Sequence, residues 1–294
     1  MDIRKIAVLG SGRLGRGIAE TAASSGFDVL LFSQGAGTHY APSQIEKSLD
    51  KKLAKWGITE SEKRVILSKI SYTSDLKELA NVDLVVEATV DHFYTKQELL
   101  RTADHLCKPN VVFITTLTTL SISELARGIS RPESLVGLHF IPPVPETPVV
   151  ELSRGFDTSD EAVAVATRFA KALKKEIVEI AESPGLVNTR ALLTLVNEAA
   201  YMIDEGVGDA IAVEKIIKQG WGLTQGPLEM ADRIGLDNVL HLMNQLREEL
   251  GERFTPCPLI RRYVRSNRLG VKTGRGFFTY ARDNIFETPI EQED

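Results

Sequence analysis

Short apolar runs alternate with amphipathic, helix-type patterns over the first part of the chain. This order is typical of βαβ units, in which helices join parallel strands. Apolar runs predict strands at residues 6–9, 28–32, 84–88, 111–114, 135–140, 149–152 and 177–180. Helical patterns cover residues 14–25 and 159–174, and a polar, lysine-rich helical stretch covers residues 42–70. The pattern therefore predicts an α/β fold with a mostly parallel, Rossmann-like sheet.

The pattern changes after the segment Ala-Glu-Ser-Pro-Gly at residues 181–185. Beyond it, apolar residues recur at helical spacing. Helices are predicted at residues 187–205, 213–219 and 238–250. We therefore expect a nucleotide-binding Rossmann-like domain over residues 1–183 and an all-α domain over residues 184–294.

Composition and charge exclude several classes of protein. Of the 294 residues, 43% are hydrophobic and 26% are charged, as in ordinary globular proteins. The formal net charge of -5 argues against a dedicated nucleic-acid binder, which needs an excess of cations. No apolar run approaches the ~18 residues of a membrane span, and no signal-peptide pattern opens the chain. Two cysteines, Cys107 and Cys257, are too few for a disulfide scaffold, so a reducing compartment, the cytoplasm, is expected.

The turn after the first predicted strand carries a phosphate-binding motif. Residues 10–15, Gly-Ser-Gly-Arg-Leu-Gly, fit Gly-x-Gly-x-x-Gly between a strand and a helix. The glycines allow a tight turn and close approach of the backbone to a pyrophosphate, which then faces the helix N-terminus. The residues assigned to this dinucleotide site are Gly10, Gly12, Arg13, Leu14 and Gly15.

The second predicted strand lacks the acidic residue that normally holds the adenosine ribose at its end. It ends Leu31-Phe32-Ser33-Gln34, without a carboxylate. Ser33 is able to hydrogen-bond a ribose hydroxyl, and because it is neutral it also tolerates a 2′-phosphate. These residues leave both NAD and NADP open as the cofactor.

Of the five histidines, His139 has the most informative position. It lies near the end of an apolar strand, at the sheet edge where α/β proteins bind ligands. Glu151 lies within the apolar run 149–152, where a buried carboxylate needs a partner. An imidazole held by a carboxylate is suited to take the proton of an alcohol while hydride leaves. No two histidines have the spacing of a helical zinc site, so no metal site is expected.

These motifs together resemble the 3-hydroxyacyl-CoA dehydrogenase family, in particular its L-3-hydroxybutyryl-CoA type. The resemblance runs over nearly the whole chain and includes Gly-Leu-His-Phe at 137–140. Its other pieces are the turn 10–15 and the segments 85–88, 120–124, 150–152, 184–188, 197–199, 226–232, 235–237 and 269–278. It implies a dehydrogenase that uses NAD, with NADP not excluded, on an acyl-CoA substrate. It also implies a homodimer formed through the helical domain.

The resemblance further implies roles for individual residues. His139 is the general base in the oxidising direction, and Glu151 orients its imidazole. Thr118 takes the position of a family serine whose hydroxyl lies next to the substrate oxygen. Asn188 stands one place before the position of a family asparagine, which is Thr189 here. Cofactor contacts are implied for Glu87, Lys96 and Thr116.

Several residues at the active cleft depart from the family pattern. They are Ser33, Thr116, Thr118, Pro142 and Thr189. Losing one polar group around a developing oxyanion lowers a rate by ~10²–10³. The base and its orienting carboxylate are kept, so a complete loss of catalysis does not follow.

Lysines are concentrated in the predicted helical stretch, at Lys47, Lys51, Lys52, Lys55 and Lys63. A solvated helical face is one interpretation of such a charge pattern. A patch that meets a polyanionic ligand is the other. Given the resemblance, Lys51 and Lys55 are candidates for contact with the CoA phosphates.

Three functions are compatible with these residues. The favoured one is an NAD(P)-dependent dehydrogenase of a small L-3-hydroxyacyl-CoA. The second keeps the fold and the His139–Glu151 pair but acts on a free hydroxy acid, because pocket substitutions are where such a change arises. The third is a non-catalytic, nucleotide-binding paralogue, which the altered cleft residues favour and the retained pair opposes.

Overall fold

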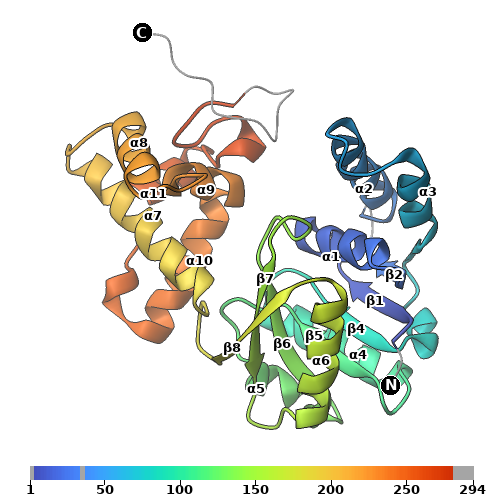
Figure 1. Ribbon diagram of the computed structural model, residues 1–294. Helices are drawn as coiled ribbons and strands as arrows, with labels where there is room; N and C mark the ends of the chain where they lie inside the picture. The colour runs from blue at the N-terminus through green and yellow to red at the C-terminus, as the bar shows by residue number, and fades with distance from the viewer. Residues whose placement is uncertain (1–2, 34–36, 281–294) are drawn as a thin grey trace. The chain divides into compact units, whose positions relative to one another are not determined.

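The computed structural model describes residues 3–33 and 37–280. The chain divides into two compact units, Met1–Leu186 and Val187–Asp294, which run from blue to yellow-green and from yellow to red in Figure 1. Each unit has a hydrophobic core of its own. Among the described helices, none is long and apolar enough to cross a membrane.

An eight-stranded sheet forms the centre of the described part of the first unit, in the order β3-β2-β1-β4-β5-β6-β7-β8. Within this sheet β6 and β7 pair antiparallel, and the other neighbours pair parallel. The strands are β1 (Lys5–Leu9), β2 (Asp28–Phe32), β3 (Ile70–Thr73), β4 (Leu84–Glu87), β5 (Val112–Thr115), β6 (Leu135–Phe140), β7 (Val149–Arg154) and β8 (Glu176–Ala181). The order from β3 to β6 is that of a Rossmann fold. The predicted mostly parallel, Rossmann-like sheet is confirmed.

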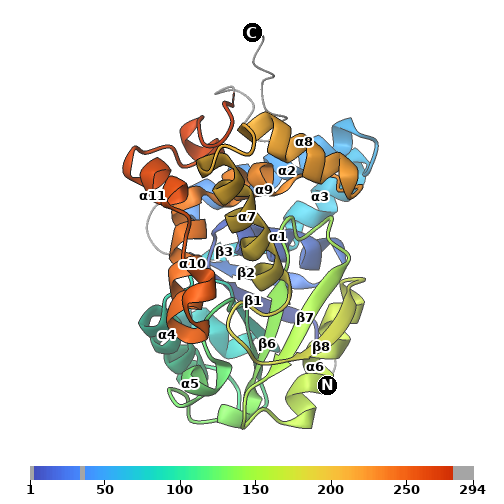
Figure 2. The same cartoon turned by 90° about the vertical axis from the view of Figure 1, so that its left-hand side faces the viewer.

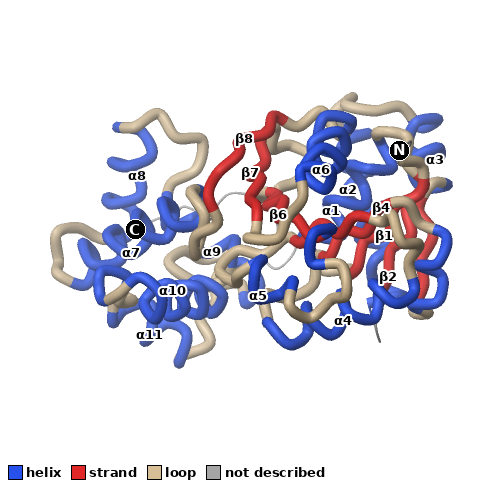
Figure 3. Tube along the Cα trace, turned by 90° about the horizontal axis from the view of Figure 1, so that it is seen from below, coloured by secondary structure: helices blue, strands red, loops and turns tan. Residues whose placement is uncertain are grey.

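Helices cover both faces of this sheet, which explains why its strands read as continuous apolar runs. One face packs against α1 (Arg13–Ser24), α2 (Gly37–Ala54), α3 (Glu60–Ser68) and α6 (Asp160–Ala172). The other face packs against α4 (Phe93–Leu106) and α5 (Ile122–Ala126). Figure 3 shows α6 and α5 on opposite sides of the strands. Residues that alternate along one strand, such as Val85 and Val86, therefore belong to different cores.

The single helical stretch expected over residues 42–70 is wrong in three respects. The first helix begins earlier, at Gly37, and ends at Ala54. A second helix starts after Thr59. The Thr59 side chain forms a capping box with Glu62, and this new N-cap separates the second helix from the first. The last residue of the stretch, Ile70, begins the edge strand β3, whose four residues are too few to give a periodic signal.

The second unit is all helical in its described part, as the sequence predicts. Its helices are α7 (Asn188–Asp204), α8 (Ala210–Gly220), α9 (Pro227–Ile234), α10 (Leu236–Leu250) and α11 (Pro258–Arg265). The predicted helices correspond to α7, α8 and α10. The short helices α9 and α11 each begin with proline, which suits the first turn because its missing N–H leaves no unpaired donor there.

One buried carboxylate fastens the last described segment to this helical unit. Asp232 of α9 is 1% exposed and accepts hydrogen bonds from the backbone N–H groups of Phe277 and Phe278 and from the Tyr280 hydroxyl, each at 3.0 Å. Burial raises the pKa of Asp232 to about 6, although these donors oppose the increase. The native protein therefore holds a proton on Asp232 at pH values where the unfolded chain has lost it.

We predict that this carboxylate makes the helical unit less stable as the pH rises from about 4 to about 6. Folding raises the pKa of Asp232. Its contribution to the free energy of unfolding is therefore fully present below the pKa of the unfolded chain, and it is lost as the pH rises through the pKa of the folded protein. The loss is on the order of 2–3 kcal/mol, at ~1.4 kcal/mol per pKa unit.

Denaturant unfolding of wild type and Asp232→Asn at pH 4.5 and 7.5 measures this loss. The wild type should lose more stability than the variant over this interval, and Tyr280→Phe, which removes one donor, should steepen the loss. An equal pH dependence in wild type and Asp232→Asn would contradict the assignment.

Candidate active site

The glycine-rich turn leaves open space at one glycine and is tightly packed at two others. A Cβ on Gly10, which has φ +113°, would lie 2.6 Å from the Ala88 carbonyl oxygen. A Cβ on Gly15 would overlap the carbonyl oxygen of Gly10. A Cβ on Gly12 would meet no atom within 4 Å. Gly10 and Gly15 thus serve close packing, whereas Gly12 borders room for another molecule.

The N-terminus of α1 faces this room with its backbone donors. Gly12 is the N-cap, and among the described residues no side chain caps the helix. The first turn carries no acidic residue and begins with the exposed Arg13, while Leu14 packs partly buried against the core. A helix N-terminus of this kind binds phosphate through its N–H groups and its dipole.

Two buried oxygen atoms near the same sheet edge also lack a partner. Within residues 3–33 and 37–280, Oδ1 of Asp91 and Oγ1 of Thr116 make no hydrogen bond. Asp91 follows β4 and Thr116 follows β5, and both strands end at the edge where the β1 turn lies. Leaving such an atom unpaired costs ~1–3 kcal/mol, so a ligand group is expected to supply the missing partner. The open Gly12 and these two oxygens fit a dinucleotide that crosses this edge.

His139 and Glu151 form a buried pair across β6 and β7. The two residues lie directly opposite each other in the antiparallel register, and Figure 2 shows the two strands side by side. His139 Nδ1 lies 2.7 Å from Glu151 Oε2, and the residues are 7% and 5% exposed. Their neighbours Leu138 and Leu152 belong to the core under α6, so the pair points to the opposite face of the sheet.

This geometry defines the protonation pattern of the imidazole. A carboxylate accepts only, so Nδ1–H donates to Glu151 and Nε2 carries the free lone pair. When Nε2 takes a proton, the carboxylate stabilises the resulting cation in a buried environment. The pair therefore has the geometry that a general base requires, an imidazole held in orientation by one hydrogen bond to a carboxylate.

Asp91 holds the turn that presents Thr118. Its Oδ2 accepts from the backbone N–H of Thr118 at 3.3 Å and of Thr119 at 3.1 Å, and from the Thr119 hydroxyl at 3.0 Å. The Thr118 carbonyl accepts from Gly185 N at 2.8 Å. The sequence analysis did not assign a function to Asp91. Its position just after a strand, at the carboxyl edge of the sheet, was the available signal.

Glu87 of β4 and Lys96 form a second buried pair, and β5 lies between β4 and the strand of His139. Their side chains are 0% and 1% exposed, and Glu87 Oε2 lies 2.7 Å from Lys96 Nζ. Thr115 Oγ1 also donates to Oε2, and the backbone and hydroxyl of Thr89 donate to Oε1. Both oxygens of Glu87 are thus used to fix the segment that leads to Asp91. Direct contact of either residue with the cofactor stays a prediction.

The remaining predicted site residues lie in different surroundings. Lys51 is exposed on α2 and Lys55 is exposed directly after its last residue, while Lys52 forms an ion pair with the buried Glu20 at 2.6 Å. Asn188 is the half-buried first residue of α7, and Thr189 beside it is 8% exposed. Their roles toward a substrate stay predictions.

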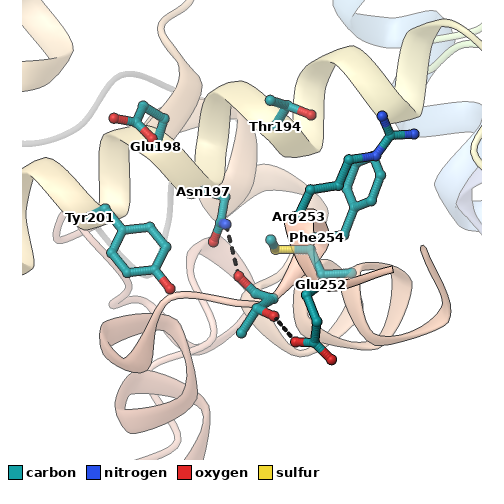
Figure 4. Close-up of a pocket in the computed structure, with 9 residues that line it drawn as sticks. Thr194, Asn197, Glu198, Tyr201, Glu252, Arg253 and Phe254 are labelled. Carbon is teal, nitrogen blue, oxygen red and sulfur yellow. Dashed lines mark hydrogen bonds between the residues drawn. The ribbon is translucent and has the colours of Figure 1, made fainter. Parts of the chain in front are cut away.

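A small pocket in the helical unit contains a polar side chain that is already hydrogen-bonded within the protein. Its volume is about 200 Å³, and Thr194, Asn197, Tyr201, Glu252 and Phe254 are among its lining residues. Figure 4 shows Asn197 pointing toward the backbone of the neighbouring segment, where its Nδ2 donates to the Thr255 carbonyl at 3.0 Å. Its Oδ1 accepts from Cys257 N at 2.8 Å. The central polar group of this pocket is thus already paired on both sides.

The Rossmann-like sheet, the open glycine turn and the buried His139–Glu151 pair are the features of an NAD-binding oxidoreductase, and the comparisons with known proteins agree. Residues 5–183 match the family model described as 3-hydroxyacyl-CoA dehydrogenase, NAD binding domain. Residues 185–280 match the C-terminal domain of the same family. The chain therefore belongs to the 3-hydroxyacyl-CoA dehydrogenase family, and the resemblance stated from the sequence is confirmed.

Individual relatives are similar over almost their full length. The chain is 37% identical to a probable 3-hydroxybutyryl-CoA dehydrogenase of Bacillus subtilis (strain 168) over 282 residues, 95% of this chain and 98% of that protein. The structure matches that of FadB2 from M. tuberculosis with a TM-score of 0.92 and 33% identity, covering 96% of this chain and 100% of the other. It matches (S)-3-hydroxybutyryl-CoA dehydrogenase PaaH1 from Ralstonia eutropha with a TM-score of 0.87 and 33% identity, at the same coverage.

The contrast between the glycines gives a test of where the nucleotide binds. We predict that Gly12→Val folds normally, because its backbone is extended (φ -64°, ψ -179°) and its Cβ meets open space. It should nevertheless lose the thermal stabilisation that NADH gives to wild type, because the valine side chain occupies the space of the nucleotide. The matched variant Gly15→Val should lower the melting temperature without any nucleotide, because its side chain meets backbone. Unchanged stabilisation of Gly12→Val by NADH would contradict this assignment.

Proposed function

We propose that this oxidoreductase converts a small L-3-hydroxyacyl-CoA, of the 3-hydroxybutyryl-CoA kind, to the 3-ketoacyl-CoA. The buried His139–Glu151 pair carries the proposal, because an alcohol oxidation needs a base at the reacting hydroxyl. The names of the relatives support the substrate class. A cytoplasmic location, expected from the cysteine content, stays part of the proposal.

His139 acts first on the substrate hydroxyl. Nε2 accepts its proton, the carbon–oxygen bond becomes a carbonyl, and the hydrogen on carbon 3 leaves as hydride. The bound nicotinamide supplies the acceptor for this hydride. Glu151 stabilises the imidazolium by accepting its Nδ1–H and keeps the ring from turning away. In the reducing direction the same imidazolium returns the proton to the oxygen.

In this proposal the Thr118 hydroxyl donates a hydrogen bond to the substrate oxygen. Asp91 fixes its backbone through the turn with Thr119, which supports a hydroxyl in a defined position. Compared with serine, threonine adds a methyl group and restricts its own rotamers. We propose a role toward the substrate for Asn188 and a contact with the nicotinamide nucleotide for Thr116.

Lys51 and Lys55 are proposed to meet the phosphates of CoA. Lys51 lies exposed in the last turn of α2, and the exposed Lys55 follows the last residue of that helix, with its backbone N–H donating to the Lys51 carbonyl at 3.3 Å. Lys52 contributes less, because its ammonium is paired with Glu20. The solvated-face interpretation predicts instead that their removal leaves thioester binding unchanged.

Substrate and base are tested together by reduction of acetoacetyl-CoA. We predict turnover of this thioester with NADH or NADPH, and a fall in kcat of ~10²–10⁴ in His139→Gln. A panel of free keto acids is run in parallel. The matched control is His105→Gln, since His105 lies exposed on α4 and should leave the rate unchanged.

Other results of these assays would support a different function or a different base. Turnover of a keto acid but not of the thioester would replace the substrate class. No turnover of any compound, with nucleotide still raising the melting temperature, would indicate the non-catalytic paralogue. An unaffected rate in His139→Gln would refute the assigned base.

We also propose that the helical unit forms a homodimer. Helix α8 and its flanks expose large apolar side chains, namely Val207 (72%), Ile211 (50%), Ile216 (73%) and Trp221 (64%). Exposed apolar clusters of this kind mark association surfaces. Light scattering should give twice the 32.4 kDa of the chain, and Ile216→Glu should shift the mass toward the monomer. A wild-type mass of one chain would contradict the proposal.

A further inference from the structure

The end of β2 presents a neutral, hydroxyl-lined surface where an acidic side chain would select NAD. Ser33 follows β2 directly and is 5% exposed, and its backbone N–H donates to the Thr73 carbonyl at 3.0 Å. Its Oγ lies 2.6 Å from Oγ of Ser11, inside the glycine-rich turn. Two hydroxyl groups therefore meet at the position from which a carboxylate would hold the ribose diol.

No carboxylate in the neighbouring sequence replaces the acidic residue that is missing at the end of β2. Between Asp28 and Glu46 the sequence contains neither aspartate nor glutamate. On the neighbouring strand, Glu78 reaches the end of β3, where its Oε1 accepts from Thr73 Oγ1 at 2.5 Å. Thr73 is the register partner of Phe32, so Glu78 is the acidic group that a test must control for.

A cation is held against the backbone of Ser11, one of the two serines. Arg16 of α1 donates from Nη1 to the Ser11 carbonyl at 2.8 Å, and its guanidinium lies 5.5 Å from the centre of the Tyr40 ring. The same Ser11 thus holds Arg16 through its backbone and Ser33 through its side chain. Burial lowers the pKa of Arg16, but a guanidinium keeps its charge.

From this arrangement we propose that the site is built to accept a 2′-phosphorylated nucleotide, so that NADP(H) binds more tightly than NAD(H). Of the hydrogen-bonded Ser11 and Ser33 hydroxyls, the one that accepts from the other would donate to the 2′-phosphate, and the Arg16 guanidinium would neutralise it. An acid at position 33 would repel the same phosphate. The inference rests on the proposed dehydrogenase function only in placing the nucleotide; it adds the choice between two cofactors.

Binding without any acyl substrate tests the inference. Nucleotide fluorescence gives dissociation constants of the full chain for NADPH and NADH, and competition compares 2′,5′-ADP with 5′-ADP. We expect NADPH to bind more tightly than NADH, and 2′,5′-ADP to compete better than 5′-ADP. Ser33→Asp should weaken NADPH at least about tenfold through like-charge repulsion and retain or improve NADH binding.

Two further variants separate the contributions of the neighbouring charges. Arg16→Gln keeps a side-chain donor for the Ser11 carbonyl, and it should weaken NADPH more than NADH and reduce the salt dependence of NADPH binding. Glu78→Gln should leave the ratio of the two dissociation constants unchanged. Thermal unfolding without nucleotide verifies that each variant is folded.

Several outcomes would overturn the inference. They are tighter binding of NADH than of NADPH by wild type, an unchanged ratio in Ser33→Asp, a ratio altered as much by Glu78→Gln as by Ser33→Asp, and binding of neither nucleotide. These outcomes are separate from failure of the proposed function. NADPH preference without reduction of acetoacetyl-CoA would reject the substrate and keep the inference, whereas NADH-preferring turnover of the thioester would do the reverse.

Discussion

The antiparallel pairing of β7 with β6 is the constraint on which the chemistry of this protein depends. The strands from β3 to β6 run in one direction, so their carboxyl ends share one edge. Because β7 returns from that edge, its third residue, Glu151, lies opposite His139, the last residue but one of β6. A parallel β7 would begin at the opposite edge, far from the imidazole. A slip of one residue in register would turn the carboxylate to the other face.

The same edge gathers the groups that we propose for nucleotide and substrate. The glycine turn follows β1, Ser33 follows β2, and Asp91 and Thr118 follow β4 and β5. Glu87 and Lys96 fix the segment between β4 and α4, and this leaves Asp91 free to hold the turn of Thr118. The residues proposed for nucleotide and substrate are therefore held by short loops at one edge of the sheet.

Much of the first unit follows from its sequence. Strand residues buried on both faces give apolar runs, and glycine spacing identifies the first turn, so the Rossmann-like sheet was predictable. The four-residue strand β3 and the break between α2 and α3 were not predicted, because a short edge strand has little periodicity and the break depends on a local cap. The proximity of His139 and Glu151 could be anticipated, since a carboxylate in an apolar strand requires a partner.

Other parts of the site depend on contacts that the sequence pattern does not contain. Glu87 and Lys96 were assigned to the cofactor by family resemblance, yet their strongest contacts are with each other and with neighbouring threonines. Asp91 acts on Thr118 and Thr119 across two loops, and Ser11 links Ser33 to Arg16. The contacts of Glu87 with Thr115, of Asp91 with Thr119 and of Ser11 with Ser33 join segments that meet only when the sheet has formed.

In the proposed mechanism Glu151 acts through His139, and the two residues form one functional unit. A double-mutant cycle of kcat/KM with Glu151→Gln, His139→Gln and the double variant measures this coupling most directly. If Glu151 only orients and stabilises the imidazole, the double variant will be no slower than His139→Gln alone. If the two losses multiply in the double variant, Glu151 contributes independently of the imidazole, and the account of the pair is wrong.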